Sequence, residues 1–133
     1  MSCPGPVPDM RRDIAARPLS SSEWQVLGAL LDLDFPGVGE LRCQMQSVRV
    51  VGQCTCGCAT VDLQADSTLC ASAGTTSPIP AEAVVLDSEG AAIWGLLVFL
   101  REGYLASLEI YSFDQPIDAL PPPERIRTQL NFR

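Results

Sequence analysis

The sequence contains no histidine and no lysine, and all nine of its basic residues are arginine. Without histidine the chain has no Ser-His or Cys-His nucleophile pair, no imidazole metal ligand and no side chain that ordinarily titrates near neutral pH. Without lysine it has no Schiff base and no phosphate-loop lysine. Because general acid–base catalysis most often uses these residues, the composition argues against an enzyme.

Positive charge is scarce, and the formal net charge of the 133-residue chain is −7. Its summed field repels phosphate backbones and anionic membrane surfaces, so we expect neither nucleic acid nor a membrane as a partner. The longest apolar run, residues 91–100, is too short to span a bilayer as a helix. With no export signal recognised, we expect a cytoplasmic protein, a location where structural disulfides are uncommon.

The hydrophobic content of 47% is enough for one domain with its own core. Four prolines before Leu19 predict a flexible N-terminal extension over residues 1–18. Residues 19–120 are predicted to form a single α+β domain. Residues 121–133, which begin with three prolines, are predicted to form a C-terminal tail.

Two helices are predicted at the start of this domain. Ser20 and Glu23 have the spacing of a capping box, and an apolar face of helical period follows until Pro36 and Gly37. This face comprises Trp24, Leu27, Leu30 and Leu31. A second short amphipathic helix is predicted from the spacing of Leu41, Met45 and Val48, and it leads into an extended segment, "VRVV".

After the second helix the hydrophobic period changes to two, which is typical of strands. One half-buried strand is predicted at residues 59–66, and three more at 81–86, 91–100 and 104–113. The turn sequences "DSEG" and "EG" separate these last three. The predicted fold is therefore α+β, with two N-terminal helices packed on one face of an antiparallel sheet of about five strands that ends in a three-stranded meander.

The second hairpin predicts a candidate binding face. If Glu102 and Gly103 form a two-residue loop, Trp94 lies opposite Tyr111, Leu96 opposite Glu109 and Val98 opposite Ser107. This register gathers Trp94, Glu109 and Tyr111 on one face. The other face, predicted to be the core side, collects Leu97, Phe99, Ala106, Leu108 and Ile110.

Two interpretations of Glu109 stay open. It could act as an acid or anchor a cationic ligand, because apolar residues flank it in the predicted strand. The favoured interpretation is an ordinary glutamate on the solvated face of a sheet.

Three cysteines, Cys54, Cys56 and Cys58, alternate along "CTCGC" and form the second candidate site. Zinc requires sulfurs under about 4 Å apart, whereas alternate residues of a straight strand are separated by roughly 6.5 Å. A curled glycine-containing loop could still hold zinc, with Cys43 or Cys70 as a fourth ligand. A reactive dithiol at Cys56 and Cys58 is a further alternative.

The favoured interpretation of this cluster is that cysteine serves as a small buried apolar residue. Cys3 and Cys70 are predicted to be incidental. The C-terminal arginines, Arg125, Arg127 and Arg133, are predicted to lie in a solvated tail, with docking to an acidic surface as the alternative.

Two stretches, "CTCGCATVDL" at residues 54–63 and "GYLASLEIYSFDQP" at 103–116, resemble a group of small uncharacterised bacterial proteins of actinobacterial type. In that group a cysteine-rich strand is similarly followed by an apolar strand and a closing "LE-aromatic" strand ahead of a proline. The resemblance covers roughly residues 27–121. It implies a cytoplasmic bacterial α+β protein and carries no catalytic residue over.

Together these features predict a non-enzymatic protein-binding or accessory module that uses an exposed sheet face around Trp94, Glu109 and Tyr111, with a protein partner or self-association. No cofactor is expected for this function. The alternative is a thiol-redox or metal-binding protein, with zinc as the metal, centred on Cys54, Cys56 and Cys58.

Overall fold

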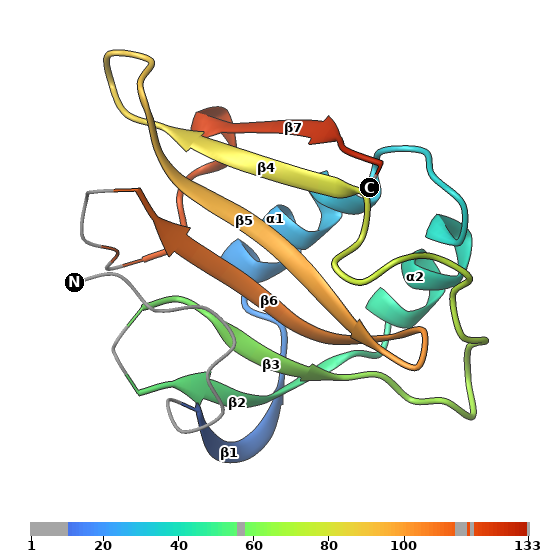
Figure 1. Ribbon diagram of the computed structural model, residues 1–133. Helices are drawn as coiled ribbons and strands as arrows, with labels where there is room; N and C mark the ends of the chain where they lie inside the picture. Colours follow the sequence, from blue (N-terminus) through green and yellow to red (C-terminus); the bar gives the residue numbers. More distant parts are fainter. Residues whose placement is uncertain (1–10, 56–57, 114–116, 118, 133) are drawn as a thin grey trace.

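In the computed structural model, which describes residues 11–55, 58–113, 117 and 119–132, seven strands pair antiparallel in a single sheet (Figure 1). Their order across the sheet is β1-β2-β3-β6-β5-β4-β7. The strands are β1 (Arg11–Pro18), β2 (Arg49–Cys54), β3 (Val61–Gln64), β4 (Ala81–Leu86), β5 (Ala92–Arg101), β6 (Tyr104–Ser112) and β7 (Ile126–Leu130). The α+β class and the antiparallel sheet are confirmed, whereas the prediction of about five strands is wrong.

The additional strands, β1 and β7, come from segments that the sequence analysis placed outside the sheet. Both lie at its edges, where only one neighbouring strand supplies hydrogen bonds. The sequence "RRDIAARP" of β1 has no alternation of apolar and polar residues, and most of its side chains are exposed. The hydrophobic period of the sequence therefore gives no sign of a strand at β1. In β7, the short 3-10 helix Pro123–Arg125 turns the chain out of the proline triplet before the strand begins.

The first helix, α1 (Ser21–Leu31), begins at the capping box that the sequence predicts. The backbone N–H of Glu23 donates to Ser20 Oγ at 3.1 Å, and the backbone N–H of Ser20 donates to the Glu23 carboxylate at 2.8 Å. The apolar face of α1 is buried except for Trp24, which is 44% exposed in the first turn.

The second helix, α2 (Val38–Met45), begins at Gly37, whose φ of 91° suits glycine. No helix in the described part of the chain is long and apolar enough to cross a membrane.

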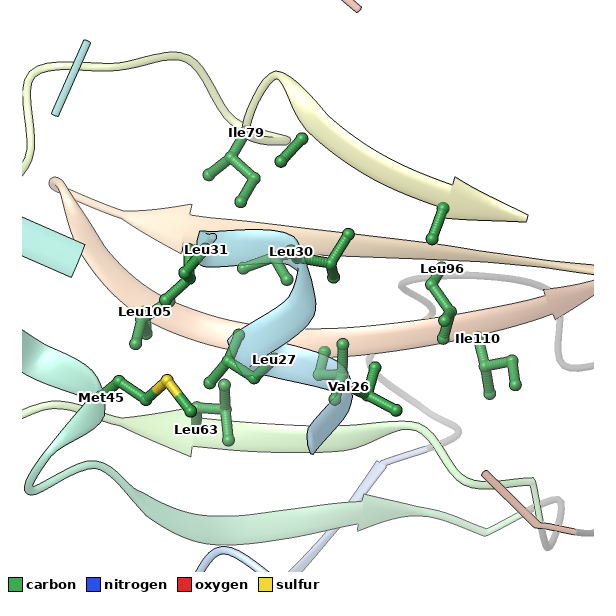
Figure 2. Close-up of a cluster of buried hydrophobic side chains, with 14 of the residues drawn as sticks. Val26, Leu27, Leu30, Leu31, Met45, Leu63, Ile79, Leu96, Leu105 and Ile110 are labelled. Carbon is green, nitrogen blue, oxygen red and sulfur yellow. The ribbon is translucent and has the colours of Figure 1, made fainter. Parts of the chain in front are cut away.

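The core lies between the two helices and one face of the sheet. Figure 2 shows Leu27 and Leu30 of α1 among side chains from β3, β5 and β6, including Leu63, Leu96 and Ile110. Leu27, Leu30 and Leu96 are fully buried, and each side chain of this kind contributes about 2 kcal/mol through the apolar surface that it removes from water. The helices therefore cover one face of the sheet, and neither of them packs on the opposite face.

A β-bulge near the turn of the β5–β6 hairpin changes the predicted register. Arg101 pairs with Tyr104 as expected, but the register shifts between Phe99 and Leu100. Beyond the shift Trp94 pairs with Ser112, Leu96 with Ile110, Leu97 with Glu109 and Val98 with Leu108. The predicted partners of Trp94, Leu96 and Val98 are therefore wrong.

The bulge also exchanges the two faces of β5. Leu96 and Val98 are fully buried in the core, whereas Leu97 and Phe99, predicted on the core side, lie on the opposite face and are only half-buried. On β6, Leu108 and Ile110 are buried on the core side as predicted. A shift of one residue has this effect because successive side chains of a strand point to opposite faces.

Candidate functional site

The face of the sheet opposite the helices is called the open face here, and it carries Leu97, Phe99, Glu109, Tyr111 and Phe113. The sequence analysis grouped Glu109 and Tyr111 with Trp94. The structure brings Glu109 and Tyr111 to the open face together. Trp94 lies two residues from Leu96 on β5, so its side chain is on the core side of the sheet. It belongs to the core cluster, with 8% of its surface exposed.

Tyr111 lies flat over its strand neighbour Gly95. A Cβ atom at Gly95 would come within 2.1 Å of Tyr111 Cζ, so only glycine leaves room for this ring. The Tyr111 ring also meets the Phe113 ring edge to face, with centroids 5.7 Å apart. Since Phe113 is 53% exposed, the pair forms the accessible end of an apolar strip that continues along β5 through Leu97 and Phe99.

Next to this strip a cleft of about 450 Å³ opens between the start of β1 and the β5–β6 hairpin. Apolar atoms of Phe99 and polar groups of both signs line it. The charged lining residues are Arg11, Asp13, Asp62, Arg101 and Glu109. A concave site with a few convergent polar groups on an otherwise apolar surface is the usual form of a ligand-binding cleft.

Glu109 lies at the floor of this cleft and is only 4% exposed, so it is not the solvated glutamate that the sequence favoured. Its Oε2 atom lies 3.0 Å from Arg11 Nη2 and accepts a hydrogen bond from Ser107 Oγ at 2.9 Å. Arg11 Nε lies 3.3 Å from the carboxylate of Asp62. A buried carboxylate is tolerated because a cation and a hydroxyl compensate for its lost hydration.

This network depends on a close approach between β2 and β3. A Cβ atom at Gly52 would come within 2.6 Å of Asp62 Oδ2, so glycine at this position allows the Asp62 side chain to lie across β2. Sequence reasoning missed Arg11 and Asp62 as partners of Glu109. A glycine inside a strand pattern was the available signal of close approach, whereas no local pattern marks Arg11.

At the cysteine cluster, Cys54 ends β2 and is buried, and its backbone N–H donates to Thr60 O at 3.2 Å. Cys58 is half-buried and packs against the core. Cys56 lies outside the described residues. Within the described ranges, no group of three or more Cys, Asp or Glu side chains is arranged to hold a metal ion. The zinc and dithiol hypotheses, which need Cys56, stay predictions.

Cys70, which the sequence analysis took to be incidental, forms a disulfide with Cys43, so that prediction is wrong. The bond joins α2 to the loop between β3 and β4. Neither sulfur is then available as a fourth ligand for a metal at the cysteine cluster. The pairing had no sequence signature, because 27 positions separate the two residues and connectivity does not follow from spacing.

Gln44, next to Cys43 on α2, attaches the same loop to the β5–β6 hairpin. Its Nε2 donates to Ala71 O and Gly103 O, both at 3.0 Å, and its Oε1 accepts from the Leu105 amide at 2.9 Å. The Leu105 amide lies at the bulge. Gln44 is fully buried, and it therefore holds the irregular backbone that directs Phe99 and Leu97 to the open face.

The fold and the site define a small antiparallel α+β protein with two helices on one face and an apolar strip beside a charged cleft on the other. No protein-family model, curated protein or solved structure matches the chain. Its function therefore has to be inferred from the geometry and charge of its own residues.

Proposed function

We propose that the protein is a non-enzymatic binding module whose protein partner lies on the open face. The observation that carries this proposal is the apolar strip of Leu97, Phe99, Tyr111 and Phe113, which α1 and α2 leave uncovered because both pack on the other face. Contiguous apolar surface beside polar groups is typical of interaction sites. All three rings of the strip belong to tyrosine or phenylalanine, types that are enriched in interface cores.

The ion pair of Glu109 has a supporting role in this proposal. Its Oε2 atom is already bonded to Arg11 and Ser107, and the carboxylate lies at the floor of the cleft. Such a network fixes the position of β1 relative to β6 and so keeps the cleft in shape. The partner then gains affinity mainly from apolar contact with the strip, while the charges at the rim select its orientation.

The test replaces one exposed aromatic residue of the strip and compares it with another exposed apolar residue elsewhere. Phe113→Asp changes the strip, and Leu69→Asp changes the exposed loop after β3, where Leu69 is 65% exposed. Both variants add one negative charge to the surface. The readout is quantitative recovery of proteins from the native lysate on each immobilised variant.

We expect a set of proteins that the wild type and Leu69→Asp recover equally and that Phe113→Asp recovers at least about tenfold less, since a buried charge at an interface core is costly. If all three baits recover the same proteins in the same amounts, the open face is not the binding site.

The alternative, a thiol-redox or metal-binding protein centred on Cys54, Cys56 and Cys58, has less support because Cys54 is buried and Cys58 packs on the core. A native mass spectrum of protein purified without chelator tests it. One bound metal ion, lost in Cys58→Ser, would favour the alternative over the proposal.

The cytoplasmic location also stays a prediction, since a disulfide such as Cys43–Cys70 is more typical of oxidising compartments.

A further inference from the structure

The two edges of the sheet differ in how well they are protected against pairing with another strand. β1 carries four charged residues, ends in Pro18, and its pairing with β2 is interrupted between Asp13 and Arg17. Charge, proline and irregularity are the devices by which edge strands avoid association. β7 has the sequence "IRTQL", with one charge, and pairs with β4 in unbroken register from Ile126 to Leu130.

The backbone of β7 offers hydrogen-bonding groups on its outer side. The N–H of Asn131 donates to Pro80 O at 2.7 Å, so Asn131 points its backbone groups toward β4. Because backbone direction alternates along an antiparallel strand, Gln129 and Arg127 point toward β4 as well. Thr128 and Leu130 therefore direct their N–H and C=O groups away from the sheet. Ile126 directs its C=O the same way, while its N–H donates to Pro123 O at the end of the 3-10 helix.

We propose that two copies of this chain associate through β7, which pairs antiparallel with β7 of the second copy across a twofold axis at Thr128. This register places Ile126 opposite Leu130 of the second copy and Thr128 opposite its own counterpart. The Thr128 pair exchanges two N–H···O bonds. Each Ile126–Leu130 pair contributes one bond, from the Leu130 N–H to the Ile126 C=O, because the Ile126 N–H already donates to Pro123 O. The two seven-stranded sheets become one continuous sheet.

The side chains of β7 are complementary to themselves in this register. Ile126, Thr128 and Leu130 share the helix side of the sheet, since their partners Val85, Ala83 and Ala81 are buried there. Leu130, which is 40% exposed, gains an apolar neighbour in Ile126 of the second copy. Cross-strand aliphatic and Thr–Thr pairs of this kind stabilise antiparallel sheets.

The open-face side of β7 is also compatible with pairing. Arg127 lies opposite Gln129 of the second copy, so no two like charges meet directly. Gln129 Nε2 in turn donates to Glu82 on β4 at 3.2 Å. Each Arg127 therefore approaches a neutral amide that is hydrogen-bonded to a carboxylate. This local contact is favourable, whereas the overall charge of −7 on each molecule opposes association.

Two substitutions at Thr128 test the proposal without removing a bond inside the monomer. Thr128→Pro deletes an outward N–H, and Thr128→Lys places two like charges opposite each other on the twofold axis. Ala16→Lys adds the same charge to an exposed position of β1 and serves as the control. Sedimentation velocity is recorded for all four proteins up to about 1 mM, since a short edge gives a small interface and a weak dimer.

We expect a concentration-dependent dimer for the wild type and Ala16→Lys, and at least a tenfold weaker association for both Thr128 variants. Residue-resolved amide exchange should show concentration-dependent protection at Thr128 and Leu130, with no such change at Arg127 and Gln129. A wild type that stays monomeric throughout, or a dimer that both Thr128 variants retain, overturns the proposal. Neither outcome depends on the partner of the open face.

Discussion

The guanidinium of Arg11 lies 3.0 Å from the carboxylate of Glu109, although β2 and β3 separate their strands in the sheet. The side chain of Arg11 thus extends across the open face and passes Asp62 on the way. Both ends of this pair are largely buried, with 12% of the arginine side chain and 5% of the glutamate side chain exposed. Removing one partner of this ion pair should therefore lower the free energy of unfolding substantially.

The first prediction concerns this pair. Glu109→Leu removes the carboxylate closest to the mostly buried Arg11 cation, and we expect it to lower the free energy of unfolding by about 3 kcal/mol. The double variant Arg11→Met with Glu109→Leu should recover most of that loss, because apolar residues of similar volume often replace a buried ion pair at little cost. Urea unfolding of the three proteins gives the comparison. Equal stability of the single and double variants would contradict the burial argument.

The second prediction concerns Gln44. Gln44→Leu removes the partners of the Ala71 carbonyl and the Leu105 amide in a fully buried place, which should lower the free energy of unfolding by about 3 kcal/mol. The matched control is Gln46→Leu, at an exposed position just past the end of α2, with an expected change under about 0.5 kcal/mol. Similar losses in both variants would show that the hydrogen bonds of Gln44 are not the cause.

The third prediction concerns the disulfide. Closing 27 residues restricts the unfolded chain, so Cys43→Ser with Cys70→Ser should lower the free energy of unfolding by about 3 kcal/mol. A phosphine reductant should have the same effect on the wild type and should expose two further thiols to alkylation. Cys58→Ser should leave this oxidised-minus-reduced difference unchanged. If reduction does not alter stability, the hydrogen bonds of the loop, including those from Gln44 and Tyr104, hold it without the disulfide.

The fourth prediction concerns pH. Burial by itself raises the pKa of Glu23, but the hydrogen bonds from Arg17 and from the Ser20 amide outweigh burial and leave the pKa below the ordinary value of a glutamate. A carboxyl whose pKa is lowered in the folded state stabilises above its unfolded pKa and loses that contribution as pH falls through the folded value. Glu23→Gln should therefore cost about 1.5 kcal/mol at pH 7 and progressively less below about pH 4.5. A difference between wild type and variant that stays constant from pH 7 to pH 3 would contradict this assignment.

The helices were predictable because their signals are local. Ser20 and Glu23 lie three positions apart, and the side chain of each accepts a hydrogen bond from the backbone N–H of the other. This spacing alone predicts the start of α1. The inner strands were predictable for the same reason, since apolar and polar positions alternate within β3, and β5 is a continuous apolar run of the kind that forms a central strand.

The candidate site was less predictable because it depends on two contacts between distant parts of the chain. The face that β5 presents is decided at the bulge, where Gln44 of α2 binds the Leu105 amide. Nothing in "REGYL" itself indicates that a bulge follows the turn. A regular hairpin with a two-residue loop therefore predicted the wrong strand partners for Trp94 and Leu96. Arg11 was missed because an exposed edge strand has no apolar period and only the folded sheet brings its side chain to Glu109.

The Cys43–Cys70 bond has a consequence for how the chain responds to proteolysis. The two residues enclose β2, β3 and the exposed turn at residues 66–69, where a protease has ready access. A single cut in that turn produces two pieces that remain one covalent molecule, with strands from both pieces still paired in the same sheet. The nicked protein therefore runs as one band in a denaturing gel and separates into two only after a reductant is added.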